Sequence, residues 1–108
     1  MAYVDGFVIP VPAEKLDAYK AQATLCAQVW KEHGALASVE CIGDDVPYGT
    51  LTSFPRAVQA KEGEIVIFSW IVYESRASRD ARLKPMMENQ AFDGKRMIFG
   101  GFQPFLGL

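Results

Sequence analysis

The chain has 108 residues, of which 50% are hydrophobic and 22% are charged, and its formal net charge is −2. This composition is typical of a globular protein and excludes a disordered or low-complexity chain. The length predicts a single domain over residues 1–108. A charge so close to neutral argues against a polyanion-binding protein, so we expect no nucleic-acid partner.

Targeting and cofactor signals are absent from the sequence. The densest apolar stretch, residues 65–73, has the length of a strand and falls short of the roughly 18 residues of a membrane helix. The N-terminus has no basic region of the kind that begins a signal peptide, so we expect a cytoplasmic protein with no membrane partner. Cys26, Cys41 and the single histidine, His33, have no metal-ligand spacing. We therefore predict reduced thiols, no metal and no cofactor.

The first third of the chain predicts a strand followed by a helix. Residues 3–9 alternate like a strand, and Pro10 and Pro12 are expected to stop it. Residues 13–33 then follow the period of a helix, and Gly34 is placed to end it. The apolar stripe of this helix consists of Leu16, Tyr19, Ala23, Cys26, Ala27 and Trp30.

The middle of the chain predicts a second strand and a long irregular segment. The strand covers residues 36–42, and a turn-rich stretch follows it. Residues 50–63 have no clear period, and a structureless segment of that length is unusual in a compact domain. We expect it to be a functional loop or to hold a short strand of its own.

The last third repeats the order of strand, helix and strand. The strongest strand covers residues 65–74, and Ser75 is a good cap for a helix over residues 76–88, which Pro85 should kink or end early. A turn at Phe92-Asp93-Gly94 precedes the last strand, which is predicted over residues 97–102. The chain therefore predicts an α+β fold with the ferredoxin-like order βαββαβ and an antiparallel sheet.

Both faces of this sheet are predicted to be apolar. On residues 65–74, Ile65, Ile67, Ile71 and Tyr73 alternate with Val66, Phe68, Trp70 and Val72. Helices cover only one face of a ferredoxin-like sheet, and soluble monomers rarely leave the other face exposed and apolar. We therefore predict a homodimer in which two sheets pack face to face as a dimeric α+β barrel. The alternative is that residues 50–63 and the C-terminal residues 105–108 fold over the sheet. The small row Val4-Gly6-Val8 favours the helix side for those residues.

Four segments of the chain resemble the DUF1428 family, the bacterial YbaA-like proteins. They are Tyr3-Val4-Asp5-Gly6-Phe7-Val8, Glu40-Cys41-Ile42-Gly43-Asp44-Asp45-Val46-Pro47, Val66-Ile67-Phe68-Ser69-Trp70 and Phe92-Asp93-Gly94-Lys95-Arg96-Met97-Ile98-Phe99-Gly100-Gly101-Phe102. The resemblance covers nearly the whole chain and implies the dimeric α+β barrel fold. It implies no activity, because the function of the family is not established.

Asp5 is the most informative polar residue, because a carboxylate on a central strand loses its water unless it is paired. We predict a small-molecule site lined by Asp5, Ser69, Trp70 and Arg96 between the sheet and a partner subunit, with Asp5 as the best catalytic candidate. The alternative for Asp5 is a structural ion pair, with Arg96 as one candidate partner.

Other polar residues have simpler interpretations. We expect Glu40, on an edge strand, to be solvated. Asp44-Asp45 is interpreted as a turn and His33 as a helix-end residue. Gly100-Gly101 within a strand indicates a bulge or a close approach by another chain.

Three functions remain open on the sequence. The first is a small-molecule site in each half of a homodimer. The second is a non-catalytic structural or stress-related dimer. The third rests on fold analogy alone: cofactor-independent monooxygenases and lactone isomerases share this barrel, as do heme-degrading enzymes. A roomy pocket that holds a carboxylate with a shifted pKa would favour a ligand site, and a fully paired Asp5 would favour a structural role.

Overall fold

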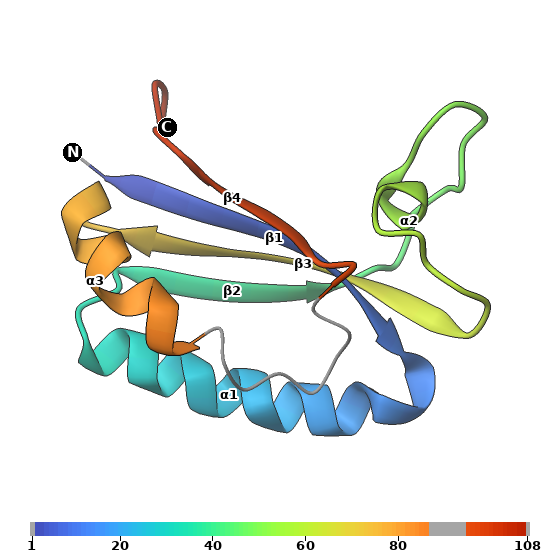
Figure 1. Ribbon diagram of the computed structural model, residues 1–108, viewed down its shortest axis with the longest axis horizontal. Coiled ribbons are helices and arrows are strands. Elements are labelled where there is room, and N and C mark those ends of the chain that lie inside the picture. Colours follow the sequence, from blue (N-terminus) through green and yellow to red (C-terminus); the bar gives the residue numbers. More distant parts are fainter. Residues whose placement is uncertain (1, 87–94, 108) are drawn as a thin grey trace.

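The computed structural model describes residues 2–86 and 95–107, which form an antiparallel sheet with α1 and α3 on one side (Figure 1). The elements are β1 (Tyr3–Pro12), a short 3-10 helix η1 (Ala13–Lys15), α1 (Leu16–Glu32), β2 (Ala37–Ile42), α2 (Phe54–Ala57), β3 (Glu64–Tyr73), α3 (Arg76–Met86) and β4 (Ile98–Phe102). Within the described residues the sheet has the order β2-β3-β1-β4, all neighbours being antiparallel. This is the ferredoxin-like order, so the predicted α+β class is confirmed.

β1 is longer than its sequence predicts. The strand continues through Pro10 and Pro12, which pair with Val66 and Glu64 of β3. The backbone N–H of Ala13 donates to the carbonyl of Gly63, so odd-numbered residues of β1 direct their N–H groups toward β3. The two proline nitrogens therefore point to the opposite side. There β4 pairs only as far as Val8, so no ladder hydrogen bond is lost.

The ends of α1 and α3 agree with the capping residues predicted from the sequence. The predicted start at residue 13 becomes the η1 turn before α1, and Gly34 has a φ of 98°, as expected of a residue that ends a helix. The Ser75 hydroxyl accepts a hydrogen bond from the Ser78 N–H at 3.1 Å, which confirms the predicted cap of α3. α3 extends to Met86 with Pro85 in its last turn, and the predicted turn at residues 92–94 lies outside the described residues.

The core lies between α1 and one face of the sheet. Phe7, Ile9 and Val11 of β1 pack with Tyr19 and Trp30 of α1. The residues that alternate with them, Val4, Gly6 and Val8, consequently lie on the other face, and the prediction that this row faces the helices is wrong. The larger side chains of β1 lie on the helix side, where they pack against Tyr19 and Trp30 of α1.

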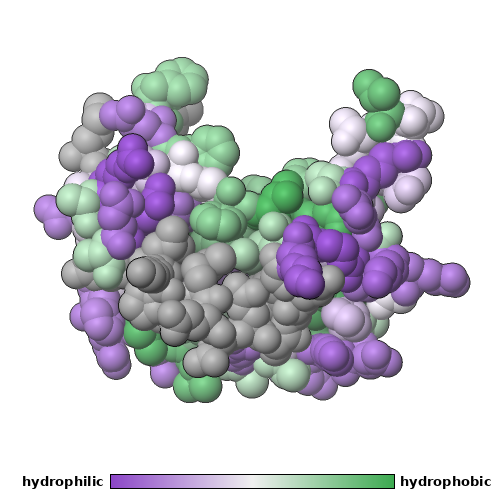
Figure 2. Space-filling model, in the orientation of Figure 1, coloured by the Kyte–Doolittle hydropathy of each residue, from purple (hydrophilic) through white to green (hydrophobic). Residues whose placement is uncertain are grey.

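The opposite face of the sheet is apolar and uncovered in a single chain. We call it the open face; it consists of Val4, Val8, Val39, Cys41, Val66, Phe68, Trp70, Val72, Ile98 and Phe102. Phe68 is 42% exposed and Phe102 is 64% exposed. In Figure 2 the molecule is hollowed between two projections, and hydrophobic side chains gather in the hollow.

Two segments project on the side of the open face (Figure 1). The arm, residues 43–63, contains the single turn α2 and no strand, so the short strand considered for residues 50–63 is not formed. Val58 of the arm is buried against Val8 and Val66, which covers one end of the open face. The tail, residues 103–107, leaves the other end, and its Phe105 is 97% exposed. The arm and the tail therefore do not cover the centre of the face.

Arg96, two residues before β4, contacts both the first residue of β3 and the arm. Nη1 and Nη2 of Arg96 lie 2.7 and 2.6 Å from the two carboxylate oxygens of Glu64, and Nη1 also donates to the Gln59 carbonyl at 2.9 Å. The hydrogen bonds from Arg96 are the main cause that lowers the pKa of Glu64 to about 2, below its ordinary value of 4.5. The Glu64 side chain is only 7% exposed, so water screens this pair weakly.

We expect acid to remove the stability that this pair contributes. The folded state lowers the Glu64 pKa, so the contribution is complete above pH 4.5 and disappears as the pH falls toward 2. Glu64→Gln should therefore lower the free energy of unfolding by about 2 kcal/mol at pH 7. Urea denaturation from pH 7 to pH 2 measures this difference, which should shrink to near zero in acid. A difference that is constant with pH would contradict the assignment.

Candidate functional site

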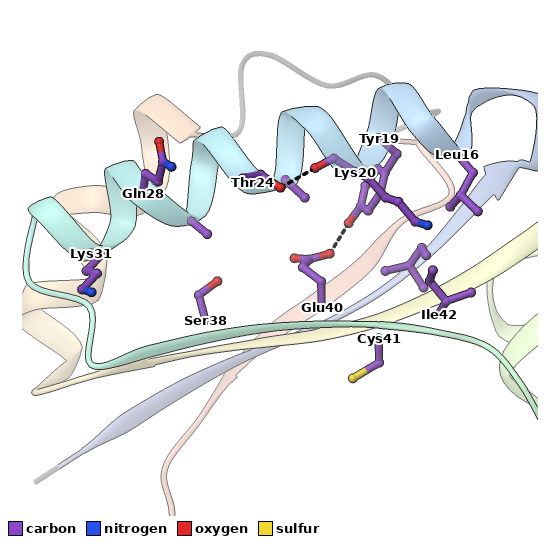
Figure 3. A pocket seen from close by; sticks show the side chains of 13 residues that line it. Leu16, Tyr19, Lys20, Thr24, Gln28, Lys31, Ser38, Glu40, Cys41 and Ile42 are labelled. Carbon is purple, nitrogen blue, oxygen red and sulfur yellow. Dashed lines mark hydrogen bonds between the residues drawn. The ribbon is translucent and has the colours of Figure 1, made fainter.

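A cavity of about 550 Å³ lies between α1 and the edge strand β2, on the helix side of the sheet (Figure 3). It is formed where α1 passes over β2, with Tyr19 of α1 reaching Glu40 of β2 across the space between them. Its lining consists of Leu16, Tyr19, Lys20, Ala23, Thr24, Ala27, Gln28, Lys31, Ser38, Glu40, Cys41, Ile42 and Ile67. Most of these residues are apolar or have only their aliphatic parts on the wall, so the cavity has an apolar body and a few polar groups, as ligand pockets do.

Glu40 is the acidic group of this pocket. Its Oε1 accepts a hydrogen bond from the Tyr19 hydroxyl of α1 at 2.5 Å (Figure 3). On the neighbouring strand, Glu40 pairs with Ser69, whose hydroxyl also hydrogen-bonds the carboxylate. Two donors from two different elements therefore fix the orientation of this carboxylate.

The surroundings of Glu40 shift three pKa values. The protein atoms around Glu40 desolvate it and raise its pKa, although the hydrogen bonds from Tyr19 and Ser69 partly oppose this. Burial, followed by the hydrogen bond to Glu40, raises the pKa of Tyr19 far above its ordinary value. Burial, followed by the charge of Glu40, also raises the pKa of the Cys26 thiol. A carboxylate held in this way is a stronger proton acceptor than one in water.

Two lysines flank the mouth of the pocket. Lys31 and Ser38 lie at one end, Lys20 and Ile42 lie at the other, and Glu40 lies between them (Figure 3). Both lysines are exposed at the surface of α1. The rim therefore carries positive charge at both ends, with the Glu40 carboxylate, which is also exposed to solvent, between the two lysines.

Asp5, the leading candidate from the sequence, lies in a different place. It is fully buried on the helix side of β1, and its Oδ1 is 3.5 Å from Nε of Arg79 in α3. The pair with Arg96 considered from the sequence is not formed, because Arg96 binds Glu64. Desolvation raises the pKa of Asp5, although the charge of Arg79 and the hydroxyl of Tyr73 partly oppose this.

Arg79, the partner of Asp5, also explains why residue 101 of β4 is a glycine. Nη2 of Arg79 donates to the Tyr3 hydroxyl at 3.1 Å. A Cβ on Gly101 would lie within 2.4 Å of that hydroxyl and closer still to Arg79. The close approach predicted at Gly100-Gly101 is therefore found at Gly101, where side chains of the same chain make it, whereas a Cβ on Gly100 would make only an ordinary contact with Phe102. Asp5, Arg79 and Tyr3 therefore form a largely buried cluster that joins α3 to β1.

The four site residues predicted from the sequence do not come together. Asp5 and Ser69 lie on the helix side, Trp70 lies on the open face, and Arg96 lies near the base of the arm. Of these, Ser69 reaches the pocket through its contact with Glu40. Two pocket residues were not predicted as site residues: Tyr19, which was interpreted as core and is buried, and Glu40, which is exposed on the edge strand as expected but also accepts a hydrogen bond from Tyr19. The available signal was that Glu40 shares its face of the strand with Ile42, an apolar residue.

Neither a metal centre nor a membrane-spanning element stands out in the part of the chain that the structure describes. Residues 2–86 and 95–107 hold no group of three or more histidines, cysteines, aspartates or glutamates that could bind a metal. The same residues hold no helix of the length and hydropathy that a membrane crossing needs. Nδ1 of His33 lies 2.9 Å from the Val29 carbonyl at the end of α1, as expected of a helix-end residue.

The strand order and the single helical layer define a ferredoxin-like α+β protein. A crystal structure of a dimeric ferredoxin-like protein from an uncultured marine organism superimposes with a TM-score of 0.64 over 99% of this chain and 98% of the other, at 11% sequence identity. The chain belongs to the family DUF1428, whose members share no assigned function, and the family pattern matches residues 2–101. The uncharacterized proteins YbaA of Escherichia coli K12 and Shigella flexneri are each 50% identical over 115 aligned residues, covering 98% of both chains.

Proposed function

We propose that the protein is a homodimer that binds a small organic molecule in the pocket between α1 and β2 of each protomer. The observation that carries the proposal is the Glu40 carboxylate, exposed to solvent on one side and held by the Tyr19 hydroxyl on the other, in a cavity of about 550 Å³. Ligand sites typically have volumes of about 300–1,000 Å³ and combine an apolar wall with a few oriented polar groups. Fixing a carboxylate with donors from α1 and β3 costs desolvation energy, which a ligand-binding role would explain.

The chemistry of the lining favours one class of ligand. Leu16, Ala23 and Ile67 offer an apolar wall, Glu40 accepts a hydrogen bond from the ligand, and the rim lysines favour a negative group. A small hydroxy acid or phenolic acid meets these three requirements, since its hydroxyl would donate to Glu40 and its carboxylate would lie near Lys20 or Lys31.

The homodimer is proposed from the open face. Its exposed apolar centre is the surface that a second sheet would cover, and the solved ferredoxin-like neighbour is described as dimeric. Pairing through the open face would place the α1–β2 pockets on the outer sides of the two sheets, so each pocket would stay accessible. Ligand binding and dimer formation can then be tested separately.

Glu40→Gln and Ala27→Phe test the pocket. We expect the wild-type protein to bind 8-anilinonaphthalene-1-sulfonate, an aromatic anion, and to gain thermal stability from members of a hydroxy- and phenolic-acid set. Ala27→Phe should fill the cavity and weaken binding at least about 10-fold, because a phenyl ring would occupy the ligand volume. Glu40→Gln should selectively remove the gain in thermal stability that comes from ligands whose hydroxyl group donates a hydrogen bond. Fluorescence titration and thermal-shift measurements report both effects.

Two controls make this test decisive. Leu25→Phe adds the same ring on the outer surface of α1, where Leu25 is 64% exposed, and should leave binding unchanged. Glu40→Gln should keep its fold. Folding raises the Glu40 pKa, so the charged carboxylate lowers the free energy of unfolding as the pH rises, and a neutral amide removes that cost. Equal ligand binding by wild type and Ala27→Phe, with both proteins folded, would refute the pocket and favour a structural dimer.

A further inference from the structure

We propose that the arm and the tail form a reciprocal clasp: the tail of one protomer lies against the arm of its partner at each end of the interface between the two sheets. This inference rests on the homodimer proposed above and adds the segments that orient it. The occupant of both segments is a second copy of this chain.

The tips of both segments present large apolar side chains to solvent. Leu51 of the arm is 89% exposed and Tyr48 is 59% exposed. In the tail, Phe105 is 97% exposed and Leu106 is 70% exposed. These side chains lie beyond the sheet itself, so a flat contact between two open faces would leave them in water. Four such residues in two short projections indicate surfaces that become buried on association.

The arm holds its shape without a partner. Nε and Nη2 of Arg56 donate to the carbonyls of Tyr48 and Gly49 at 2.9 and 3.1 Å, and the guanidinium lies 3.9 Å from the centre of the Tyr48 ring. Gly49 has a φ of 68°, and a Cβ there would lie 2.6 Å from the Thr52 carbonyl oxygen. Leu51 and Tyr48 are therefore exposed in a loop whose conformation is fixed by contacts within the protomer. A preformed surface loses little entropy when it binds.

The two projections stand at opposite ends of β1. The arm packs on Val8 and Val66, whereas the tail follows Phe102, which pairs with Val4. Both rise away from α1, with the hollow between them (Figures 1 and 2). Two open faces could pack in two ways: with the two arm ends together (like ends), or with the arm end of one protomer at the tail end of the other (unlike ends). Like ends would bring the two bulky arms into collision, so the two-fold arrangement that fits places each arm at the tail end of its partner.

Single-cysteine crosslinking tests the clasp. In a Cys26→Ala, Cys41→Ala background, a Leu51→Cys protein and a differently tagged Phe105→Cys protein are mixed, exchanged and oxidised. We expect a disulfide between the two different chains and much less product from either protein alone. Preferential Leu51–Leu51 or Phe105–Phe105 products would overturn the unlike-end arrangement. The background protein must first elute as the wild type does.

Dimer affinity provides the second measurement and separates the two proposals. Phe105→Asp should weaken the wild-type dimer about 10- to 100-fold, whereas Leu25→Asp on the outer surface of α1 should not change it. A protein that remains an equally tight dimer with Phe105→Asp, and gives no 51–105 crosslink, would refute the clasp and leave the dimer intact. A wild-type protein that is monomeric would remove the dimer and the clasp together, while the pocket would be unaffected.

Discussion

Phe68→Asp should convert the protein from a dimer to a folded monomer. Phe68 lies on the open face, where its ring is 5.7 Å from the Trp70 ring and 5.8 Å from the Phe54 ring, and it is 42% exposed in the single chain. In a two-fold dimer the substitution occurs twice. Losing the burial of two phenyl groups costs about 4 kcal/mol, which corresponds to an approximately 1,000-fold weaker dimer. The two new carboxylates would weaken it further.

Light scattering coupled to size-exclusion chromatography measures this change. Wild type should have about twice the chain mass of 12.0 kDa, and the Phe68→Asp protein should have that mass itself with an unchanged far-ultraviolet circular dichroism spectrum. Phe102→Asp, on the same face at 64% exposure, provides a second test if Phe68→Asp perturbs the fold. A wild-type protein of 12.0 kDa in solution would exclude the dimer.

Phe7→Asp is the matched contrast. Phe7 is 7% exposed on the helix side of the same sheet and stacks on Phe99 with 5.9 Å between ring centres. A charge there would be buried in the core of the protomer, so this protein should fail to fold at any concentration. Monomer formation by both variants with native spectra would mean that the two faces have been assigned incorrectly.

Arg79→Met should destabilise the protomer by about 3 kcal/mol at pH 7, because it leaves the Asp5 carboxylate buried without its counter-charge. Asp5 is fully buried, and neither of its oxygens makes a hydrogen bond of good geometry within the described residues. The pKa of Asp5 is already raised by desolvation in the wild type and should rise further once Arg79 is removed.

The pH dependence of this variant has a definite sign. Folding raises the pKa of Asp5, so the charged carboxylate lowers the free energy of unfolding. This destabilisation is absent below the ordinary pKa of 3.8, where the group is protonated in both states, and it is complete above the folded pKa. The loss caused by Arg79→Met should consequently shrink as the pH is lowered from 7 toward 4. Urea denaturation over that range measures it, and a loss that is the same at every pH would contradict the ion-pair account.

Asp5→Asn completes the comparison. The double variant Asp5→Asn, Arg79→Met should recover part of the loss of Arg79→Met, because neither charge remains buried alone. Asp5→Asn should also retain ligand binding in the pocket, since the acidic group there is Glu40. Loss of ligand binding by a stable Asp5→Asn protein would return Asp5 to the site predicted from the sequence.

The pattern of residues determined the elements and their order before any packing was known. Alternation in residues 3–9 and 65–74 and the stripe on residues 13–33 are local consequences of the periods of strands and helices. Ser75 and Gly34 mark helix ends because capping and left-handed geometry depend on a few neighbouring atoms. The four motifs that resemble DUF1428 identified the family from the sequence.

Tertiary structure decided which face of the sheet is which and which charges meet. Alternation is symmetric about the plane of a sheet, so only the position of α1 shows that Phe7 is buried and Phe68 is not. The partners of Asp5 and Glu40 lie on α3 and α1, 74 and 21 residues away along the chain, and no local rule connects positions so far apart. Burial and charge pairing depend on distance in space, and therefore the pocket became visible only when α1 was placed over β2.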